Sequence, residues 1–125
     1  MLTGGYSGAR AYCQSKLAQI MFTIDLAAAL QGTGVTVTSL HPATYMDTSM
    51  VRRAGVSPLS TVEEGARAIL NLATSPAVAG QTGLYFNGLW EAEAQAQAYD
   101  AEARRRLQAL SLELTGLSAE ATAAP

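Results

Sequence analysis

The sequence contains 125 residues, with 8 Lys and Arg residues against 10 Asp and Glu residues, so its formal net charge is −2. This acidic balance argues against a nucleic-acid binder, which needs a basic surface stripe. Hydrophobic residues make up 49% of the chain and charged residues only 14%, a composition that excludes intrinsic disorder. The length suits one domain of ordinary size.

The single cysteine and the single histidine limit the kinds of site that the chain can build. Cys13 alone excludes a disulfide framework, and together with His41 it is too little for a zinc cluster, so we expect no metal site. No apolar run reaches the roughly 18 residues of a membrane helix, and residues 1–9 lack the features of a secretory signal. We therefore expect a soluble cytoplasmic protein without membrane contact.

A glycine-rich stretch opens the chain, and a helical pattern follows it. Residues 1–10 predict a loop. Residues 11–30 predict a helix, because apolar side chains recur at three- and four-residue spacing. These positions are Leu17, Ile20, Met21, Ile24 and Ala28. Residues 35–40, Val-Thr-Val-Thr-Ser-Leu, predict a strand of a buried parallel sheet.

The alternation of helix and strand continues downstream. Residues 41–59 predict a polar loop, and residues 60–73 predict a helix that begins with a capping box. Two boxes are possible, Ser60 with Glu63 or Thr61 with Glu64. Residues 84–87 predict a second short strand, and the alanine- and glutamine-rich residues 91–98 predict a partly helical segment.

The last predicted helix covers residues 100–115. Asp100 is its expected N-cap, and Gly116 is expected to end it. Residues 104–106, three consecutive arginines, predict a solvated helix face. The small residues of 118–125 predict a flexible tail.

Taken together, the elements have the order helix, strand, helix, strand, helix. Two parallel strands do not make a finished sheet, because parallel sheets usually have four or more strands with both faces covered. We therefore expect an α/β fold in which this chain is part of a larger, doubly wound parallel sheet.

Tyr12 and Lys16 are the residues with the clearest chemical potential. Their i, i+4 spacing places the phenol and the ammonium on one helical face. An unperturbed tyrosine is a poor base at neutral pH, and a nearby cation favours the phenolate, so the pair could donate and accept protons. The alternative is an ordinary amphipathic helix that contains both residues by chance.

The wider context resembles one family. Tyr-Cys-Gln-Ser-Lys on a helix, then Val-Thr-Val-Thr-Ser-Leu-His-Pro, the helix at 60–73 and the Gly-Leu-Tyr-Phe-Asn-Gly strand resemble the short-chain dehydrogenase/reductase family. The Asp-Ala-Glu-Ala-Arg-Arg-Arg ending resembles its retinol-dehydrogenase-like branch. The resemblance covers about residues 10–117. It implies that residues 1–117 form the C-terminal half of a Rossmann domain that uses NAD or NADP on a small-molecule carbonyl or alcohol.

The resemblance also implies roles for individual residues. Tyr12 would exchange a proton with the substrate oxygen, and Lys16 would bind the nicotinamide ribose. Cofactor contacts are implied for Tyr12, Lys16, Pro42, Ala43, Thr44 and Thr48. The chain departs from the family at two of these positions: Ala43 replaces the usual glycine, and Thr48 lies one residue further from Pro42 than usual.

The family's glycine-rich dinucleotide loop and catalytic serine have no counterparts here. Residues 3–10 imitate that loop, but no strand leads into them, so they are interpreted as plain loop. We therefore expect an oxidoreductase chain that is inactive alone. The alternative is a non-catalytic oligomerisation or regulatory fragment, and the family resemblance implies a homo-oligomer formed through the Tyr-Lys helix.

Overall fold

Helices and a three-stranded sheet account for much of residues 5–117, which are the residues that this computed structural model describes. In chain order the elements are α1 (Gly8–Ala29), β1 (Ser39–His41), α2 (Ser49–Arg53), α3 (Val62–Thr74), η1 (Pro76–Val78), β2 (Tyr85–Asn87), β3 (Trp90–Ala92), η2 (Ala96–Tyr99) and α4 (Ala101–Thr115). Residues 1–4 of the predicted loop and the predicted tail at 118–125 lie outside the described residues.

The sheet has the order β1-β2-β3, with β1 at one edge and β3 at the other. β1 pairs in parallel with β2, so that Ser39 lies opposite Tyr85. β3 returns antiparallel to β2 through a tight turn at Gly88, whose φ of 60° lies in the left-handed region. The parallel strand pair and the surrounding helices confirm the predicted α/β class, a partial Rossmann fold.

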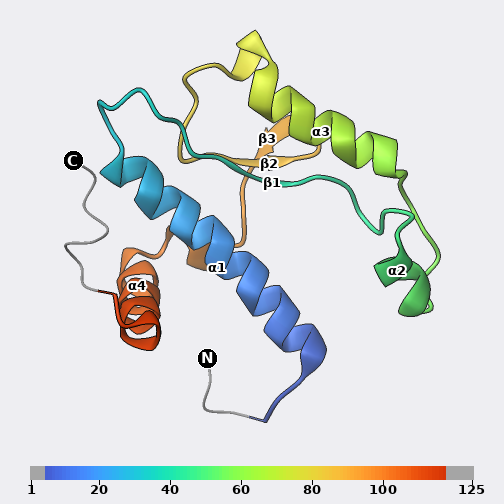
Figure 1. Cartoon of the computed structure of the whole chain (residues 1–125), viewed down its shortest axis with the longest axis horizontal. Coiled ribbons are helices and arrows are strands. Elements are labelled where there is room, and N and C mark those ends of the chain that lie inside the picture. Colours follow the sequence, from blue (N-terminus) through green and yellow to red (C-terminus); the bar gives the residue numbers. More distant parts are fainter. Residues whose placement is uncertain (1–4, 118–125) are drawn as a thin grey trace.

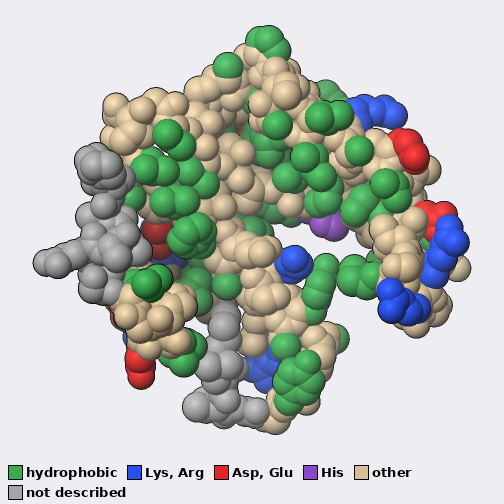
Figure 2. All heavy atoms as spheres, in the orientation of Figure 1, with side chains coloured by type: hydrophobic (Ala, Val, Ile, Leu, Met, Phe, Trp, Pro, Cys, Tyr) green, Lys and Arg blue, Asp and Glu red, His purple; other side chains and the backbone are tan. Residues whose placement is uncertain are grey.

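Helices lie on both sides of the sheet. Figure 1 shows α1 and α4 together on one side of the strands and α3 on the other. The buried hydrophobic side chains are few and mostly small: Met21, Ala27, Val51, Ala68, Phe86 and Ala98. Much apolar surface therefore stays exposed, and Figure 2 shows hydrophobic side chains over the region of α3. Val62, Ile69 and Leu70 of this helix are 48–61% exposed.

The first strand is shorter than the sequence predicts. Instead of residues 35–40, the paired strand covers Ser39–His41. Val37 is joined to the segment before β2 through a side chain, because Thr82 Oγ1 accepts the Val37 N–H at 3.0 Å. A hydroxyl thus replaces a main-chain partner there, and the regular ladder starts two residues later.

Three other segments also differ from the prediction. Residues 8–10, predicted as loop, form the first turn of α1, and the predicted loop at 41–59 contains the short helix α2. Residues 91–98, predicted as partly helical, contribute to β3 and to the 3-10 turn η2. Glu91 pairs with Phe86 in the ladder, so strand pairing overrides the helix propensity of the alanine-rich sequence there.

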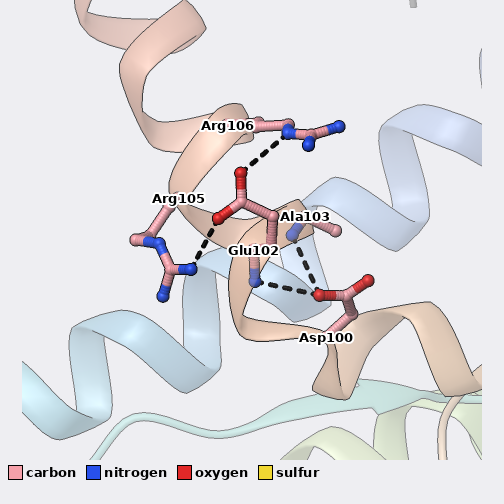
Figure 3. A network of polar contacts seen from close by, with 5 residues as sticks. All are labelled: Asp100, Glu102, Ala103, Arg105 and Arg106. Carbon is pink, nitrogen blue, oxygen red and sulfur yellow. Dashed lines mark hydrogen bonds and ion pairs between the residues drawn. The ribbon is translucent and has the colours of Figure 1, made fainter.

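The caps of α3 and α4 follow directly from the sequence. Helix α3 uses the second of the two possible capping boxes: Thr61 Oγ1 accepts the Glu64 N–H at 3.1 Å, and Glu64 Oε2 accepts the Thr61 N–H at 2.7 Å. The N-cap of helix α4 is Asp100, whose Oδ1 accepts the N–H groups of Glu102 and Ala103 (Figure 3). These bonds satisfy donors that a helix N-terminus otherwise leaves free.

The three arginines of α4 have two different environments. Arg105 and Arg106 share the Glu102 carboxylate on the exposed side of the helix (Figure 3). Arg104 is only 16% exposed, and its Nε lies 2.6 Å from Asp25 Oδ1 of α1. The prediction of a solvated face is therefore wrong for Arg104, which fastens α4 to α1.

Candidate active site

Tyr12 and Lys16 lie together on the N-terminal half of α1. The Lys16 Nζ atom lies 5.5 Å from the centroid of the Tyr12 ring, so the ammonium sits over the aromatic face. The Tyr12 side chain is 52% exposed, and Lys16 is exposed as well. The pair is thus assembled as the helical spacing predicts, and both polar groups can be reached from outside.

The other hydroxyl of this motif has a structural partner. Ser15 Oγ donates a hydrogen bond of 2.7 Å to the Tyr12 carbonyl oxygen, three residues earlier on the same helix. This bond ties the Ser15 side chain to the helix backbone. Tyr12 and Lys16, in contrast, are exposed and carry their polar groups outward from the helix.

The segment after β1 holds the remaining candidate residues. Pro42 and Ala43 are half-buried, whereas Thr44 is exposed. The Thr44 hydroxyl lies 3.0 Å from His41 Nε2, so the residue at the end of β1 is bonded across the turn that follows. Tyr45 comes next and has a φ of 45°, an unusual value for a residue other than glycine, which reverses the chain sharply.

Thr48 has a structural role in this segment, as the N-cap of α2. Its Oγ1 accepts the Val51 N–H, at 3.4 Å. Beside it, Arg52 donates from Nε and Nη2 to the two oxygens of Asp47, at 2.6 and 2.7 Å. The hydrogen bonds from Arg52 hold the pKa of the Asp47 carboxyl below its ordinary value, and Asp47 raises the pKa of Arg52.

The base of this loop is closed by backbone contacts and by a methionine. Met46 forms an isolated parallel bridge with Ser60, and the Leu59 N–H donates to the Tyr45 carbonyl oxygen at 3.0 Å. The Met46 sulfur packs against Gly65 of α3, where a side chain would have no room. Sequence reasoning missed this contact; the glycine inside a helical pattern was the signal that could have indicated it.

The two groups of candidate residues lie on one side of the molecule. Figure 1 shows the N-terminal end of α1 on the same side as α2, which follows the carboxyl end of β1. Within residues 5–117, no hydrogen bond or ion pair joins Tyr12 or Lys16 to the segment 42–48. The structure therefore brings together Tyr12 with Lys16, and His41 with Thr44, without a direct polar contact between the two pairs among the described residues.

An apolar groove lies elsewhere on the molecule. The groove, of about 450 Å³, runs between α1 and α4 and includes Phe22 and Leu26 from α1 and Leu107 and Leu112 from α4. Neither Tyr12 nor Lys16 lines it. The groove is thus separate from the candidate catalytic pair.

The sequence is similar to those of several retinol dehydrogenases. The chain is 38% identical to human retinol dehydrogenase 13 over 94% of its own length and 40% of the relative's. It is 38% identical to human retinol dehydrogenase 14 and 35% identical to human retinol dehydrogenase 11, in each case over 90% of the chain. The chain thus spans about 40% of the length of these relatives.

Two further comparisons found nothing: no family model matches the chain, and no solved structure matches it. Among residues 5–117, no helix combines the length and apolar character needed to cross a membrane.

Proposed function

Because the chain belongs to the short-chain dehydrogenase/reductase family, on its retinol-dehydrogenase-like branch, we propose that it supplies the proton-transfer half of an NAD(P)-dependent oxidoreductase. The reaction is hydride transfer between the nicotinamide and a carbonyl or alcohol carbon. The observation that carries this proposal is the Lys16 ammonium over the Tyr12 ring on an accessible face of α1.

The chemistry assigned to the pair follows from the two side chains. In reduction, the Tyr12 hydroxyl donates its proton to the substrate oxygen as that oxygen gains negative charge. In oxidation, the phenolate of Tyr12 accepts the proton of the alcohol. The positive charge of Lys16 lies close to the phenol ring and stabilises the negative charge that develops on the phenol oxygen during proton transfer.

The residues present fit the nicotinamide-ribose end of a dinucleotide. Lys16 offers ammonium hydrogens that ribose hydroxyls can accept, and its side chain is exposed. The half-buried Pro42 and Ala43 offer a backbone surface for the nicotinamide, with Thr44 beside them. Thr48 accepts a hydrogen bond from α2 but keeps its hydroxyl hydrogen for a carboxamide oxygen. When bound, NAD or NADP supplies or accepts the hydride.

The substrate is proposed from the relatives and from the loop beside the site. The relatives are named for retinol, an apolar alcohol. In this chain, Met50 and Leu59 of the loop after β1 are 60% and 70% exposed. Exposed apolar side chains in a binding loop favour an apolar alcohol or aldehyde, which is the substrate class to test first. The cytoplasmic setting stays a prediction, which fractionation of producing cells tests.

Replacement of the phenol tests the catalytic role. We expect Tyr12→Phe, made in a polypeptide that joins this chain to a dinucleotide-binding half, to lower kcat by about 10²- to 10⁴-fold. Cofactor affinity, measured by nucleotide fluorescence, should stay within about twofold. Tyr6→Phe is the matched control, because Tyr6 lies before α1 and is 88% exposed. Unchanged turnover of the Tyr12 variant would refute the proton-transfer role.

The chain alone should not turn over, because its relatives are about two and a half times as long and the glycine-rich phosphate loop is not recognisable in its sequence. Incubation of the purified chain with NADH or NADPH and an aldehyde tests this expectation. Steady nucleotide oxidation above the enzyme-free rate would contradict it.

A second candidate function is self-association through α1, without catalysis. Met21, part of the predicted packing stripe, is buried within the chain and unavailable to a partner. Phe22, by contrast, is 62% exposed at the groove between α1 and α4. Exposed aromatic surface of this kind favours protein contacts. Sedimentation of the chain and of Phe22→Ser tests this role; a strict monomer at high concentration would count against it.

A further inference from the structure

His41 is the last residue of β1, and its side chain closes the start of the loop that follows. The imidazole Nε2 atom lies 3.0 Å from the Thr44 hydroxyl oxygen, three residues further along the chain. Pro42 lies between them and has no N–H group, so it cannot donate a hydrogen bond within this turn. The two side chains therefore span a stretch of backbone with few bonding groups of its own.

The main chain provides no equivalent bond here. A tight turn over residues 41–44 would ordinarily be closed by the carbonyl of its first residue, which accepts the N–H of its fourth. The His41 carbonyl instead accepts the Gly88 N–H at 2.9 Å, and no backbone hydrogen bond among the described residues joins His41 to Thr44. The imidazole thus replaces the backbone bond, because the carbonyl of His41 is committed to the neighbouring turn.

The second half of the loop is fixed by other contacts. The Leu59 N–H donates to the Tyr45 carbonyl at 3.0 Å, and Met46 forms a bridge with Ser60. These contacts begin at residue 45. Within residues 5–117, the bond to His41 is the hydrogen bond that holds the stretch 42–44 between β1 and this anchored half. The orientation of the stretch therefore depends on one side-chain contact.

The bond to His41 orders the Thr44 hydroxyl without using up its capacity to bind a ligand. A threonine hydroxyl has one hydrogen to donate and two lone pairs to accept with. Whether it donates to Nε2 or accepts from it, at least one lone pair stays available, and the side chain is exposed. A side chain that is already ordered costs less to immobilise when a ligand binds.

We propose that His41 is a positioning residue of the cofactor loop: its imidazole fixes the Thr44 hydroxyl in the orientation that binds the carboxamide of NAD or NADP. The carboxamide both donates and accepts hydrogen bonds, so a hydroxyl is a suitable partner for it. Because Nε2 is occupied by Thr44, His41 acts through that residue and does not serve as the base of the reaction. The inference rests on the proposed function.

Two substitutions of His41 test the contact by its reach. The amide nitrogen of a glutamine lies about where Nε2 lies, whereas that of an asparagine reaches only to the place of Nδ1. In the polypeptide that joins this chain to a dinucleotide-binding half, His41→Asn should raise the Kd for NADH or NADPH about three- to tenfold, and His41→Gln should restore most of the affinity. Nucleotide fluorescence measures both. An unchanged Kd in the His41→Asn variant would overturn the proposal.

Steady-state kinetics separate positioning from catalysis. In the His41→Asn variant the KM for the nucleotide should rise with the Kd, while kcat at saturating nucleotide should stay within about twofold. Tyr12→Phe should show the opposite pattern. If Tyr12→Phe leaves turnover unchanged but His41→Asn weakens nucleotide binding, the proton-transfer role fails and the positioning role stands. A joined polypeptide that binds neither NADH nor NADPH would overturn both.

A double-mutant cycle tests whether His41 acts through Thr44. Thr44→Val removes the hydroxyl and keeps the branched shape, and after it His41→Asn should cause no further loss of nucleotide affinity. Losses that simply add would overturn the proposal, because they would mean that the two residues act separately.

The chain alone provides a readout that needs no cofactor. His41 is the single histidine of the sequence, so the imidazole nitrogen resonances in an NMR spectrum belong to one residue. Thr44→Val should move the Nε2 resonance, because the bond to the hydroxyl is lost. A resonance that does not respond would overturn the proposal. If His41→Asn fails to fold, this measurement and the nucleotide affinity of Thr44→Val, which should fall by the same factor, decide.

Discussion

The sulfur of Met46 occupies the space that a side chain on Gly65 would need. Met46 belongs to the loop after β1, and Gly65 is buried in the second turn of α3. The contact therefore seats the candidate cofactor loop directly on a helix backbone. The glycine is required here for close approach, because it lies in an ordinary helix and needs no unusual backbone angle.

The first prediction concerns this contact. Gly65→Ala should gain about 1 kcal/mol of helix propensity but lose about 1–3 kcal/mol to overpacking against Met46. We expect overpacking to win, because the backbone on both sides of the Met46 side chain is fixed by hydrogen bonds, and the free energy of unfolding should fall by about 1 kcal/mol. Urea denaturation measures this change.

Two variants make the explanation testable. The double variant Met46→Ala, Gly65→Ala should lose less free energy of unfolding than the two single variants lose together. The reason is that the methyl group at position 65 then fills the space left by the Met46 side chain. Gly8→Ala is the matched control, since a Cβ atom at Gly8 meets only the Tyr6 hydroxyl, at an ordinary 3.9 Å. If the Gly65→Ala variant is more stable than the original chain, the Met46 side chain moves aside at a cost smaller than the gain in helix propensity.

The second prediction separates the two capping boxes of α3. Thr61→Ala should lower the free energy of unfolding by about 1 kcal/mol, because it removes the acceptor for the Glu64 N–H. Ser60→Ala should have a much smaller effect, since Ser60 contributes its carbonyl, which accepts the Asp47 N–H. Thermal melts of both variants measure the difference. Equal losses would mean that the helix start shifts between the two boxes.

Helix ends could be predicted from the sequence where a capping residue lies at the boundary, whereas strand pairing could not. The elements bounded by local signals, such as the capping boxes and Asp100, could be located closely because the signal lies within four residues of the boundary. β3 could not be predicted, because its pairing with β2 depends on the turn at Gly88 and on register, while its own sequence favours helix.

The candidate site divides in the same way. The contact of Tyr12 with Lys16 could be predicted, because helical geometry alone brings residues four apart together. The support of the loop after β1 by Met46 and Gly65 could not, because it joins residues that are far apart in the chain. The ion pair of Arg104 with Asp25 could not be predicted either, because the local sequence does not distinguish Arg104 from the two arginines that follow it.

The third prediction concerns the difference between Arg104, which is paired with Asp25 of α1, and the exposed Arg106. Arg104→Ala should lower the free energy of unfolding by about 1–2 kcal/mol, because it removes the ion pair with Asp25 and a 3.0 Å hydrogen bond to the Ala98 carbonyl. Arg106→Ala is the control on the same helix; its side chain is 78% exposed, so the loss should be far smaller. Urea denaturation with both variants measures the contrast. Equal effects would show that Arg104 does not anchor α4.

The last prediction concerns pH and the loop that contains α2. The Arg52 guanidinium holds the pKa of Asp47 below its ordinary value of 3.8, so this pair stabilises the folded loop fully above that value. As the pH falls below 3.8 and through the lowered pKa of the folded state, Asp47 takes up a proton and the stabilisation disappears. Both side chains are exposed, so added salt should weaken the effect.

Amide exchange at Val51 and Arg52, compared between pH 6 and pH 3 after correction for the intrinsic rate, measures this loss. In the Asp47→Asn variant these amides should be as weakly protected at pH 6 as at pH 3, because asparagine cannot form the ion pair. Arg52→Lys keeps the charge but not the two parallel hydrogen bonds, so it should retain only part of the protection. If the unsubstituted loop keeps the same protection at pH 3 as at pH 6, the Asp47–Arg52 pair does not order it, and the Thr48 cap and the Met46–Ser60 bridge are sufficient.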